Sequence, residues 1–187
     1  MNNLKEKIDL ALAEAQTAQI FDKAVVGVLL PNQETLFVSL NASPDSVFDI
    51  ASLTKVCPTS TLALHYILKG ELSLETPVIT WIEELQTNFR EQIFLKHLLT
   101  HSLDYRVPMS TLKHLSPETI LSHLYSYTFE EAPGTVFNYG NPASILLGII
   151  LQRFSGKPLS VLGKELLFDP LQMTRSGWFP LERIPRA

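Results

Sequence analysis

Cysteine is nearly absent from this sequence, and long apolar runs and an excess of positive charge are absent altogether. The one cysteine, Cys57, cannot form a disulfide within the chain, and it suits a reducing compartment. The apolar run at residues 145–151 (ILLGIIL) is far shorter than the roughly 20 residues of a membrane-spanning helix, so we expect no membrane span. The net charge of -4 offers no basic surface, which argues against nucleic acid and anionic membranes as partners.

The amino-terminal residues lack the features of a secretion signal. Residues 1–7 (MNNLKEK) are mostly polar, and no uninterrupted apolar segment follows them. We therefore expect a cytoplasmic protein. A periplasmic or secreted protein, whose upstream signal has been removed, is the alternative.

Two common classes of catalytic motif are missing as well. G-x-S-x-G does not occur, which argues against an α/β-hydrolase. His97 and His101 have the i, i+4 spacing of a helical metal pair, but Leu98 stands where the zinc-protease motif has glutamate. We interpret both histidines as structural, and we expect no metal and no other cofactor.

The sequence does contain enough apolar residues for a folded core, at 45% hydrophobic and 18% charged. A length of 187 residues suits a single domain, residues 1–187. The hydrophobic periodicity predicts an α+β fold, with a helix and a β-hairpin in residues 1–45 and a mostly helical subdomain in residues 46–180. Helices are predicted over residues 4–20, 52–69, 93–100, 116–127, 141–156 and 157–168, strands over 24–30 and 35–40, an irregular segment over 103–115, and the start of a strand over 177–179.

Capping residues predict several helix boundaries. Ser116 and Asn141 each precede a proline and suit N-caps, while Gly70 and Gly156 suit helix ends. Pro58 lies early in the helix predicted over residues 52–69. A proline is tolerable there, because the N–H that it lacks would have little or no partner within the helix.

Ser52 and Lys55 form the motif S-x-x-K at the start of that predicted helix. Residues three apart share a helix face, so the hydroxyl and the amine should lie close together. A serine hydroxyl becomes a strong nucleophile only when a base takes its proton, and a lysine held as a free amine can do this. The helix N-terminus also offers backbone N–H groups to an oxyanion. A surface serine and lysine without chemistry would match the same pattern.

Tyr139 and Asn141 form a second motif, Y-x-N. A tyrosine beside a lysine ammonium can shuttle a proton between Ser52 and a leaving group. The asparagine amide offers a donor and an acceptor to a substrate amide. A packed tyrosine followed by a helix N-cap is the structural alternative for this motif. Both motifs begin a predicted helix after an apolar run, so the pair is more informative than either alone.

With these two motifs in place, the chain resembles the serine β-lactamase-related superfamily, in its branch of class C β-lactamases, D,D-peptidases and esterases. The resemblance covers about residues 21–180. Several separated segments carry it in the family's order: FDIASLTK at residues 48–55, LSLETPV at 72–78, KHLLTHS at 96–102, PGTVFNYGN at 133–141 and PLQM at 170–173.

The resemblance implies roles for four residues. Ser52 would be the nucleophile that forms the acyl-enzyme, Lys55 its proton acceptor and Tyr139 the general acid and base, while Asn141 would position the substrate. A lactam, a D-alanyl peptide or a small ester is the implied substrate. The implied fold is an antiparallel sheet flanked by a helical subdomain.

The chain departs from the family pattern at two places. The third family motif, a Lys or His followed by Thr or Ser and then Gly, does not occur, and we expect a chain truncated at its C-terminal side. Ser102-Leu103-Asp104 stands where the family has Thr-Ser-Gly, so this turn is expected to differ.

These departures leave two functions open. One is a serine hydrolase, with turnover slowed by the missing motif. The other is a weak or inactive fragment that serves as a binding or interaction module. In both cases we expect the hairpin, apolar on both faces in places, to present an exposed sheet edge through which the protein self-associates.

Overall fold

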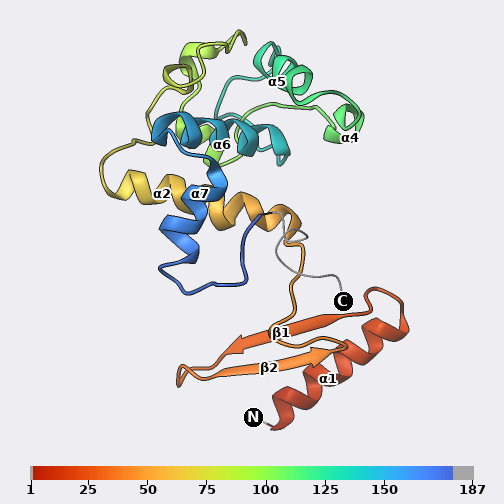
Figure 1. The fold of residues 1–187 in the computed structure, drawn as a ribbon. Helices are drawn as coiled ribbons and strands as arrows, with labels where there is room; N and C mark the ends of the chain where they lie inside the picture. Colours follow the sequence, from red (N-terminus) through yellow and green to blue (C-terminus); the bar gives the residue numbers. More distant parts are fainter. Residues whose placement is uncertain (1, 179–187) are drawn as a thin grey trace. The chain divides into compact units, whose positions relative to one another are not determined.

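The computed structural model describes residues 2–178, which divide into two compact units between Asp49 and Ile50. The first unit holds one helix and a hairpin, and the second is helical, in agreement with the predicted α+β class (Figure 1). In chain order the elements are α1 Asn2–Thr17, β1 Ala24–Leu29, β2 Thr35–Leu40, η1 Ala51–Lys55, η2 Val56–Ser60, α2 Thr61–Leu68, η3 Val78–Thr80, η4 Arg90–Gln92, α3 Leu95–Leu99, α4 Met109–Leu112, α5 Pro117–Tyr125, α6 Asn141–Ser155, α7 Leu159–Gly163 and η5 Lys164–Phe168.

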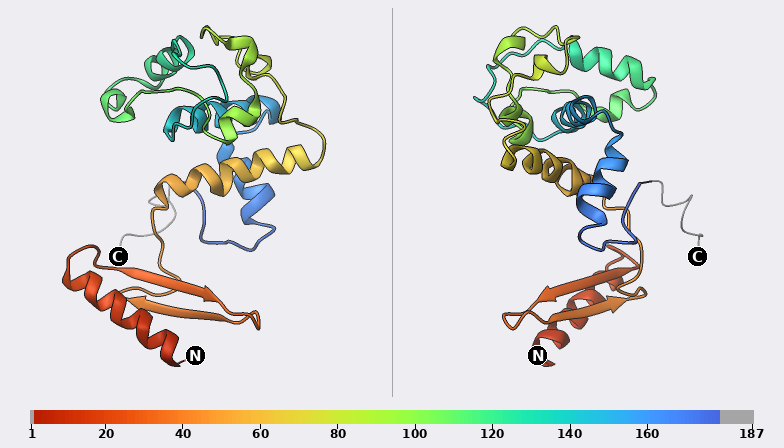
Figure 2. Two further views of the ribbon diagram at one scale, coloured as in Figure 1. Left: turned by 180° about the vertical axis from the view of Figure 1, so that it is seen from behind. Right: turned by 60° about the vertical axis from the view of Figure 1, so that its left-hand side comes forward.

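The first unit is a two-stranded antiparallel sheet with α1 along one of its faces (Figure 2). The register pairs Ala24 with Leu40 and Leu29 with Thr35. Side chains alternate between the faces of a strand, and Val38 of β2 is buried with Leu12 of α1. The hairpin prediction is therefore correct, and one helix supplies the cover that a lone hairpin needs.

The second unit is built around α6. Its sequence is apolar on most sides, which is typical of a helix surrounded by other elements. It packs against α3, α2, η2 and α7. The core that results includes Leu146, Leu147, Ile150 and Leu151 of α6, with Leu62 of α2. This core holds α2, which follows Ser52 in the chain, and α6, which follows Tyr139.

The capping signals predicted two boundaries of this unit correctly. The Ser116 side chain accepts a hydrogen bond from the Thr119 N–H at 3.2 Å, with Pro117 at the first helical position of α5. Gly156 ends α6 with φ 70°, a conformation that glycine adopts without a steric penalty.

The continuous helix predicted over residues 52–69 is wrong. A 3-10 turn, η1, leads into a wide turn, η2, and the regular helix α2 begins only at Thr61. Within η2, Cys57 leaves the helical region, with φ -109° and ψ 103°. The cause is Pro58, because a proline ring disfavours the helical conformation in the residue before it.

Two smaller predictions also need correction. The irregular segment 103–115 contains the short helix α4. No strand begins at Gly177 or Trp178, and Phe179 lies outside the described residues. Within residues 2–178, no single helix is both long and apolar enough to cross a membrane. Helix α6 passes that test only together with residues 159–168, across a bend of 83°.

Candidate active site

Ser52 and Lys55 lie three residues apart in the tight turn η1. In a 3-10 helix, residues i and i+3 are eclipsed, so their side chains stand one above the other. The Lys55 Nζ donates a hydrogen bond to the Ser52 Oγ at 2.8 Å. The motif therefore brings amine and hydroxyl into contact, although through a 3-10 turn and not through the α-helix that we predicted.

The backbone on both sides of Ser52 is unusual. Ala51 has φ 44°, in the left-handed region that residues with a Cβ seldom occupy. On the other side, the regular helical path is interrupted at Cys57, as described above. Ser52 thus lies in a short, sharply bounded turn, and it is exposed to solvent.

Tyr139 reaches the same pair from the segment before α6. The Lys55 Nζ lies 5.1 Å from the centroid of the Tyr139 ring. Hydrogen bonding with the Ser52 side chain lowers the pKa of Tyr139, and the hydrogen bond and charge of Lys55 lower it further. The structure therefore brings Ser52, Lys55 and Tyr139 together within the second unit.

Asn141 differs from the other three predicted site residues. It is the first residue of α6, and the N-cap position belongs to Gly140, so Asn141 does not act as the helix cap. Its side chain is exposed, and among the described residues the structure joins it to none of Ser52, Lys55 and Tyr139. The amide is therefore available to a ligand.

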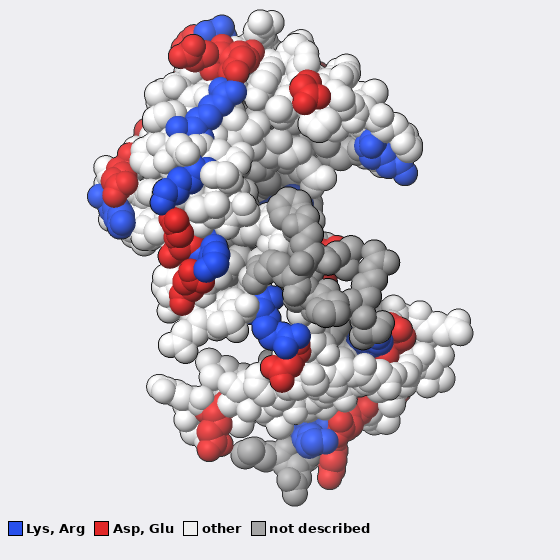
Figure 3. Space-filling view, viewed as in Figure 1, with Lys and Arg blue, Asp and Glu red and all other residues white. Residues whose placement is uncertain are grey.

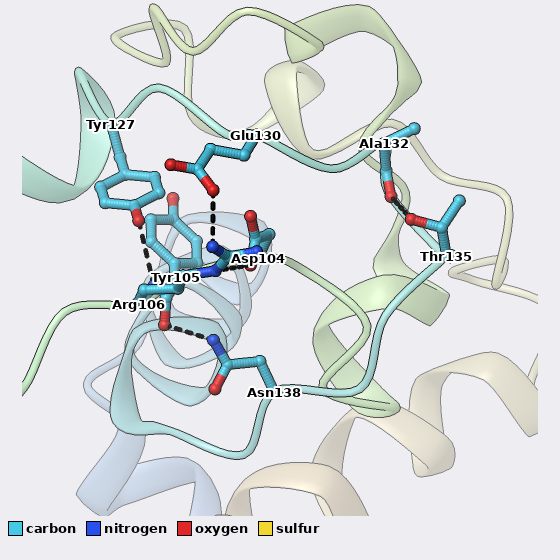
Figure 4. Close-up of polar contacts among 8 residues, drawn as sticks. All are labelled: Asp104, Tyr105, Arg106, Tyr127, Glu130, Ala132, Thr135 and Asn138. Carbon is cyan, nitrogen blue, oxygen red and sulfur yellow. Dashed lines mark hydrogen bonds and ion pairs between the residues drawn. The ribbon is translucent and has the colours of Figure 1, made fainter.

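The segment that precedes Tyr139 is anchored to residues 101–106 by backbone and side-chain hydrogen bonds. The Gly134 N–H donates to the Ser102 carbonyl at 2.8 Å, and the Asn138 N–H donates to the His101 carbonyl at 2.9 Å. The Asn138 amide also donates to the Tyr105 carbonyl at 2.8 Å (Figure 4). The last of these bonds is made by Asn138, directly before Tyr139, so the bonds position the Tyr139 backbone.

An ion cluster in the same region escaped the sequence analysis. The Arg106 Nε lies 2.7 Å from the Asp104 Oδ1, and the Arg106 Nη1 lies 2.5 Å from the Glu130 Oε2 (Figure 4). Asp104 is only 3% exposed, and a buried carboxylate needs such a partner. The hydrogen bond to Asp104 contributes most to raising the pKa of Arg106, and the negative charges of Asp104 and Glu130 raise it further. The sequence showed only that Asp104 replaces a family glycine.

His97 has a structural role, as the sequence suggested. It is buried, and its Nδ1 accepts a hydrogen bond from the Phe94 N–H at 3.2 Å. Burial, and then the charge of Lys96, lower the pKa of His97. Residues 2–178 contain no group of three or more His, Cys, Asp or Glu side chains arranged to hold a metal ion.

His101 contacts the site directly, which the sequence did not reveal. Its ring centroid lies 4.9 Å from that of Tyr139, with the ring planes at 49°. Burial lowers the pKa of His101, and the positive charge of Lys55 lowers it further. Both effects favour the neutral form of the imidazole.

Charges of both signs are interspersed on the face of the molecule shown in Figure 3. Two surface hollows, of about 610 and 360 Å³, lie beside the ion pair of Arg153 with Glu84. None of the predicted site residues lines either hollow, so neither hollow is the Ser52 site.

Comparison with known proteins relates this site to a family. The family model described as Beta-lactamase matches residues 10–187. Esterase EstB of Burkholderia gladioli is 30% identical over an alignment of 159 residues, which covers 74% of this chain and 40% of that protein. Lovastatin esterase of Penicillium rubens is 29% identical over an alignment of 166 residues, which covers 74% of this chain and 41% of that protein. The chain thus spans about two-fifths of the length of these two curated relatives.

Solved structures show the same fold at lower sequence identity. A class C beta-lactamase superposes with a TM-score of 0.77 at 21% identity, covering 89% of this chain and 48% of that one. D-amino acid amidase of Ochrobactrum anthropi SV3 superposes with a TM-score of 0.69 at 22% identity, covering 83% of this chain and 50% of that one. With a family model that matches nearly its whole length, the chain belongs to the beta-lactamase family.

Proposed function

We propose that the protein is a serine hydrolase that forms an acyl-enzyme on Ser52 and accepts small esters. The observation that supports this proposal most strongly is the 2.8 Å contact between the Lys55 Nζ and the Ser52 Oγ, with the Tyr139 ring centroid 5.1 Å from the same Nζ. A nucleophile within hydrogen-bond reach of a base, and a third group that touches both, is the arrangement that acyl transfer requires.

In the first step Lys55, as a free amine, would take the proton of the Ser52 hydroxyl. The Oγ would then bond to the carbonyl carbon of the ester and form a tetrahedral oxyanion. Backbone N–H groups at the start of η1 would stabilise that oxyanion. The family's second oxyanion donor comes from the strand of the third motif, and the loss of one such donor costs about 3–4 kcal/mol in the transition state.

In the second step Tyr139 would protonate the departing alcohol and recover its proton from the Lys55 ammonium. The pKa of Tyr139 is lowered by Ser52 and Lys55, which brings the phenol closer to the value that suits proton transfer at neutral pH. A water molecule would then attack the acyl group on Ser52, release the acid and restore the serine. Asn141, whose amide is exposed, would position the substrate carbonyl substituent.

Esters are the first choice of substrate because two relatives of this chain are named esterases. Amides, D-alanyl peptides and lactams remain within the proposal, since an amidase and a class C beta-lactamase share the fold. An ester is also the least demanding test, because its leaving group needs little protonation.

A second candidate function is a binding or interaction module that no longer turns over substrate. The Ser52 and Asn141 side chains are both exposed, and this observation fits a site that binds a ligand without converting it. The two candidates differ in one property, which is covalent reactivity of Ser52 in the folded protein.

Hydrolysis of p-nitrophenyl acetate tests the proposal. Ser52→Ala and Lys55→Ala should each reduce the rate to background, and the double variant should be no slower than either, because the two residues act as a unit. Tyr139→Phe should cost less than about tenfold, since nitrophenolate leaves without help. Ser122→Ala, at an exposed serine of α5, is the matched control and should match the wild type. Full activity in Ser52→Ala would rule out the proposed nucleophile.

A further inference from the structure

The Tyr139 side chain has few neighbours to hold it in place. Its side chain is 56% exposed, which is a large value for a tyrosine that must keep its phenol on a neighbouring serine. Apart from the contacts with Ser52 and Lys55, the described residues offer its ring one aromatic neighbour, which is His101 at 4.9 Å. The imidazole therefore limits where the Tyr139 ring can lie.

The His101 backbone is held in an unusual conformation. Its φ is 54°, in the left-handed region, where histidine is found more often than most residues with a side chain. Hydrogen bonds on both sides maintain it. The Ser102 N–H donates to the His97 carbonyl at 3.0 Å, and the Asn138 N–H donates to the His101 carbonyl at 2.9 Å. Strained positions that are held so firmly are concentrated at functional sites.

The electrostatic surroundings of the His101 imidazole favour its uncharged form, which suits a ring beside the Lys55 amine. Burial and the Lys55 charge lower the pKa of His101, which favours the neutral ring. Its Nδ1 is buried and has no hydrogen-bond partner within residues 2–178, which suits an unprotonated nitrogen. A neutral ring can support Tyr139 without adding a second cation beside Lys55.

We propose that His101 is a positioning residue for Tyr139, whose ring it holds over Lys55 and whose preceding peptide it fixes through its carbonyl. This inference rests on the proposed function, in which the Tyr139 phenol exchanges a proton with Ser52 and Lys55. His101 itself touches no reacting atom. Its effect is to exclude alternative rotamers of the Tyr139 side chain, which would otherwise carry the phenol away from Ser52.

Removing the imidazole while keeping the backbone is the direct perturbation. In His101→Asn the asparagine tolerates φ 54°, and its backbone carbonyl still accepts the hydrogen bond from the Asn138 N–H. Its side chain has no aromatic ring to pack against Tyr139. We expect kcat for ethyl hexanoate, whose poor leaving group needs the Tyr139 proton, to fall about tenfold with KM nearly unchanged, and no further than in Tyr139→Phe, because misplacing a catalytic group affects the chemical step. His101→Phe, which restores a ring, should recover most of the loss.

A second readout does not depend on turnover. Tyrosine labelled with 13C at Cζ reports each phenol titration by NMR, and the Tyr139 signal is identified by its loss in Tyr139→Phe. If His101 holds the phenol on Ser52 and Lys55, then in His101→Asn the pKa of Tyr139 should rise toward the ordinary value of 10.0. His123→Asn, at an exposed histidine of α5, is the matched control and should leave the titration unchanged.

The outcomes separate the two claims. An unchanged Tyr139 titration in His101→Asn would overturn the positioning role, whatever the rates show. Wild-type hydrolysis by Ser52→Ala would instead overturn the proposed function, and the titration would still decide about His101. If His101→Asn does not fold, His101→Gly serves the same purpose, because glycine adopts φ 54° without strain.

Discussion

Replacing Arg106 by glutamine should destabilise the protein much more than replacing its second partner, Glu130. Asp104 is 3% exposed, and its Oδ2 has no hydrogen-bond partner within residues 2–178, so Arg106 is the group that neutralises it. Breaking a fully buried ion pair costs about 3–5 kcal/mol. Arg106 is 51% exposed, so water screens part of the interaction, and we expect a loss of about 2–3 kcal/mol in the free energy of unfolding.

The contrast with the exposed partner makes this prediction specific. Glu130 is 73% exposed, and Glu130→Gln should cost less than about 1 kcal/mol. The double variant Asp104→Asn with Arg106→Gln should be more stable than Arg106→Gln alone, because it leaves no buried charge without a partner. Urea unfolding at pH 7, followed by circular dichroism, measures all of these differences. Arg90→Gln, at an exposed pair with Glu91, is the control. Equal losses for Arg106→Gln and Glu130→Gln, within about 0.5 kcal/mol, would refute the reasoning.

Three further predictions concern the stability of the fold and its association. The hydrogen bond from Arg153 lowers the pKa of Glu84 from 4.5 to about 2, so the stability from this pair is complete above pH 4.5 and is lost as the pH falls toward 2. Both side chains are more than a third exposed, so Arg153→Gln should cost at most about 1 kcal/mol. The urea midpoint of this variant should change less with pH in that range than the wild-type midpoint does, and an equal change in both proteins would contradict this. Ile150→Ala should cost about 2–5 kcal/mol in urea unfolding, whereas Leu68→Ala, at an 87% exposed position, should cost less than about 0.5 kcal/mol, and equal costs would contradict the placement of the core at α6. Within residues 2–178 the β1–β2 hairpin pairs with no further strand, and its edges should cause self-association, visible as a sedimentation coefficient that rises with concentration; a monomer at all concentrations would count against it.

The sequence predicted most of what depends on near neighbours in the chain. Ser116 and Gly156 were recognised as helix boundaries because capping is a local interaction. The contact between Ser52 and Lys55 followed from their spacing, since residues three apart meet in a 3-10 turn as well as in an α-helix. The prediction of a continuous helix over residues 52–69 was wrong because Pro58 disfavours the helical conformation in Cys57, the residue before it.

What the sequence could not predict depends on contacts between distant segments. The pairing of Arg106 with Glu130 joins residues 24 positions apart, and no local pattern links them. The contact of His101 with Tyr139 arises in the same way, because it requires the turn after α3 to meet the segment before α6. The i, i+4 spacing of His97 and His101 carries no information about this contact.

Covalent labelling of the folded protein with a fluorophosphonate probe, followed by peptide mass spectrometry, tests the central claim most directly. The short contact of the Lys55 Nζ with the Ser52 Oγ predicts a single adduct on Ser52, lost in Ser52→Ala, strongly slowed in Lys55→Ala and unchanged in Ser122→Ala. Folding is verified beforehand by cooperative thermal unfolding. An adduct at another residue, or no adduct in folded wild-type protein, would contradict the assignment of Ser52 as an activated nucleophile.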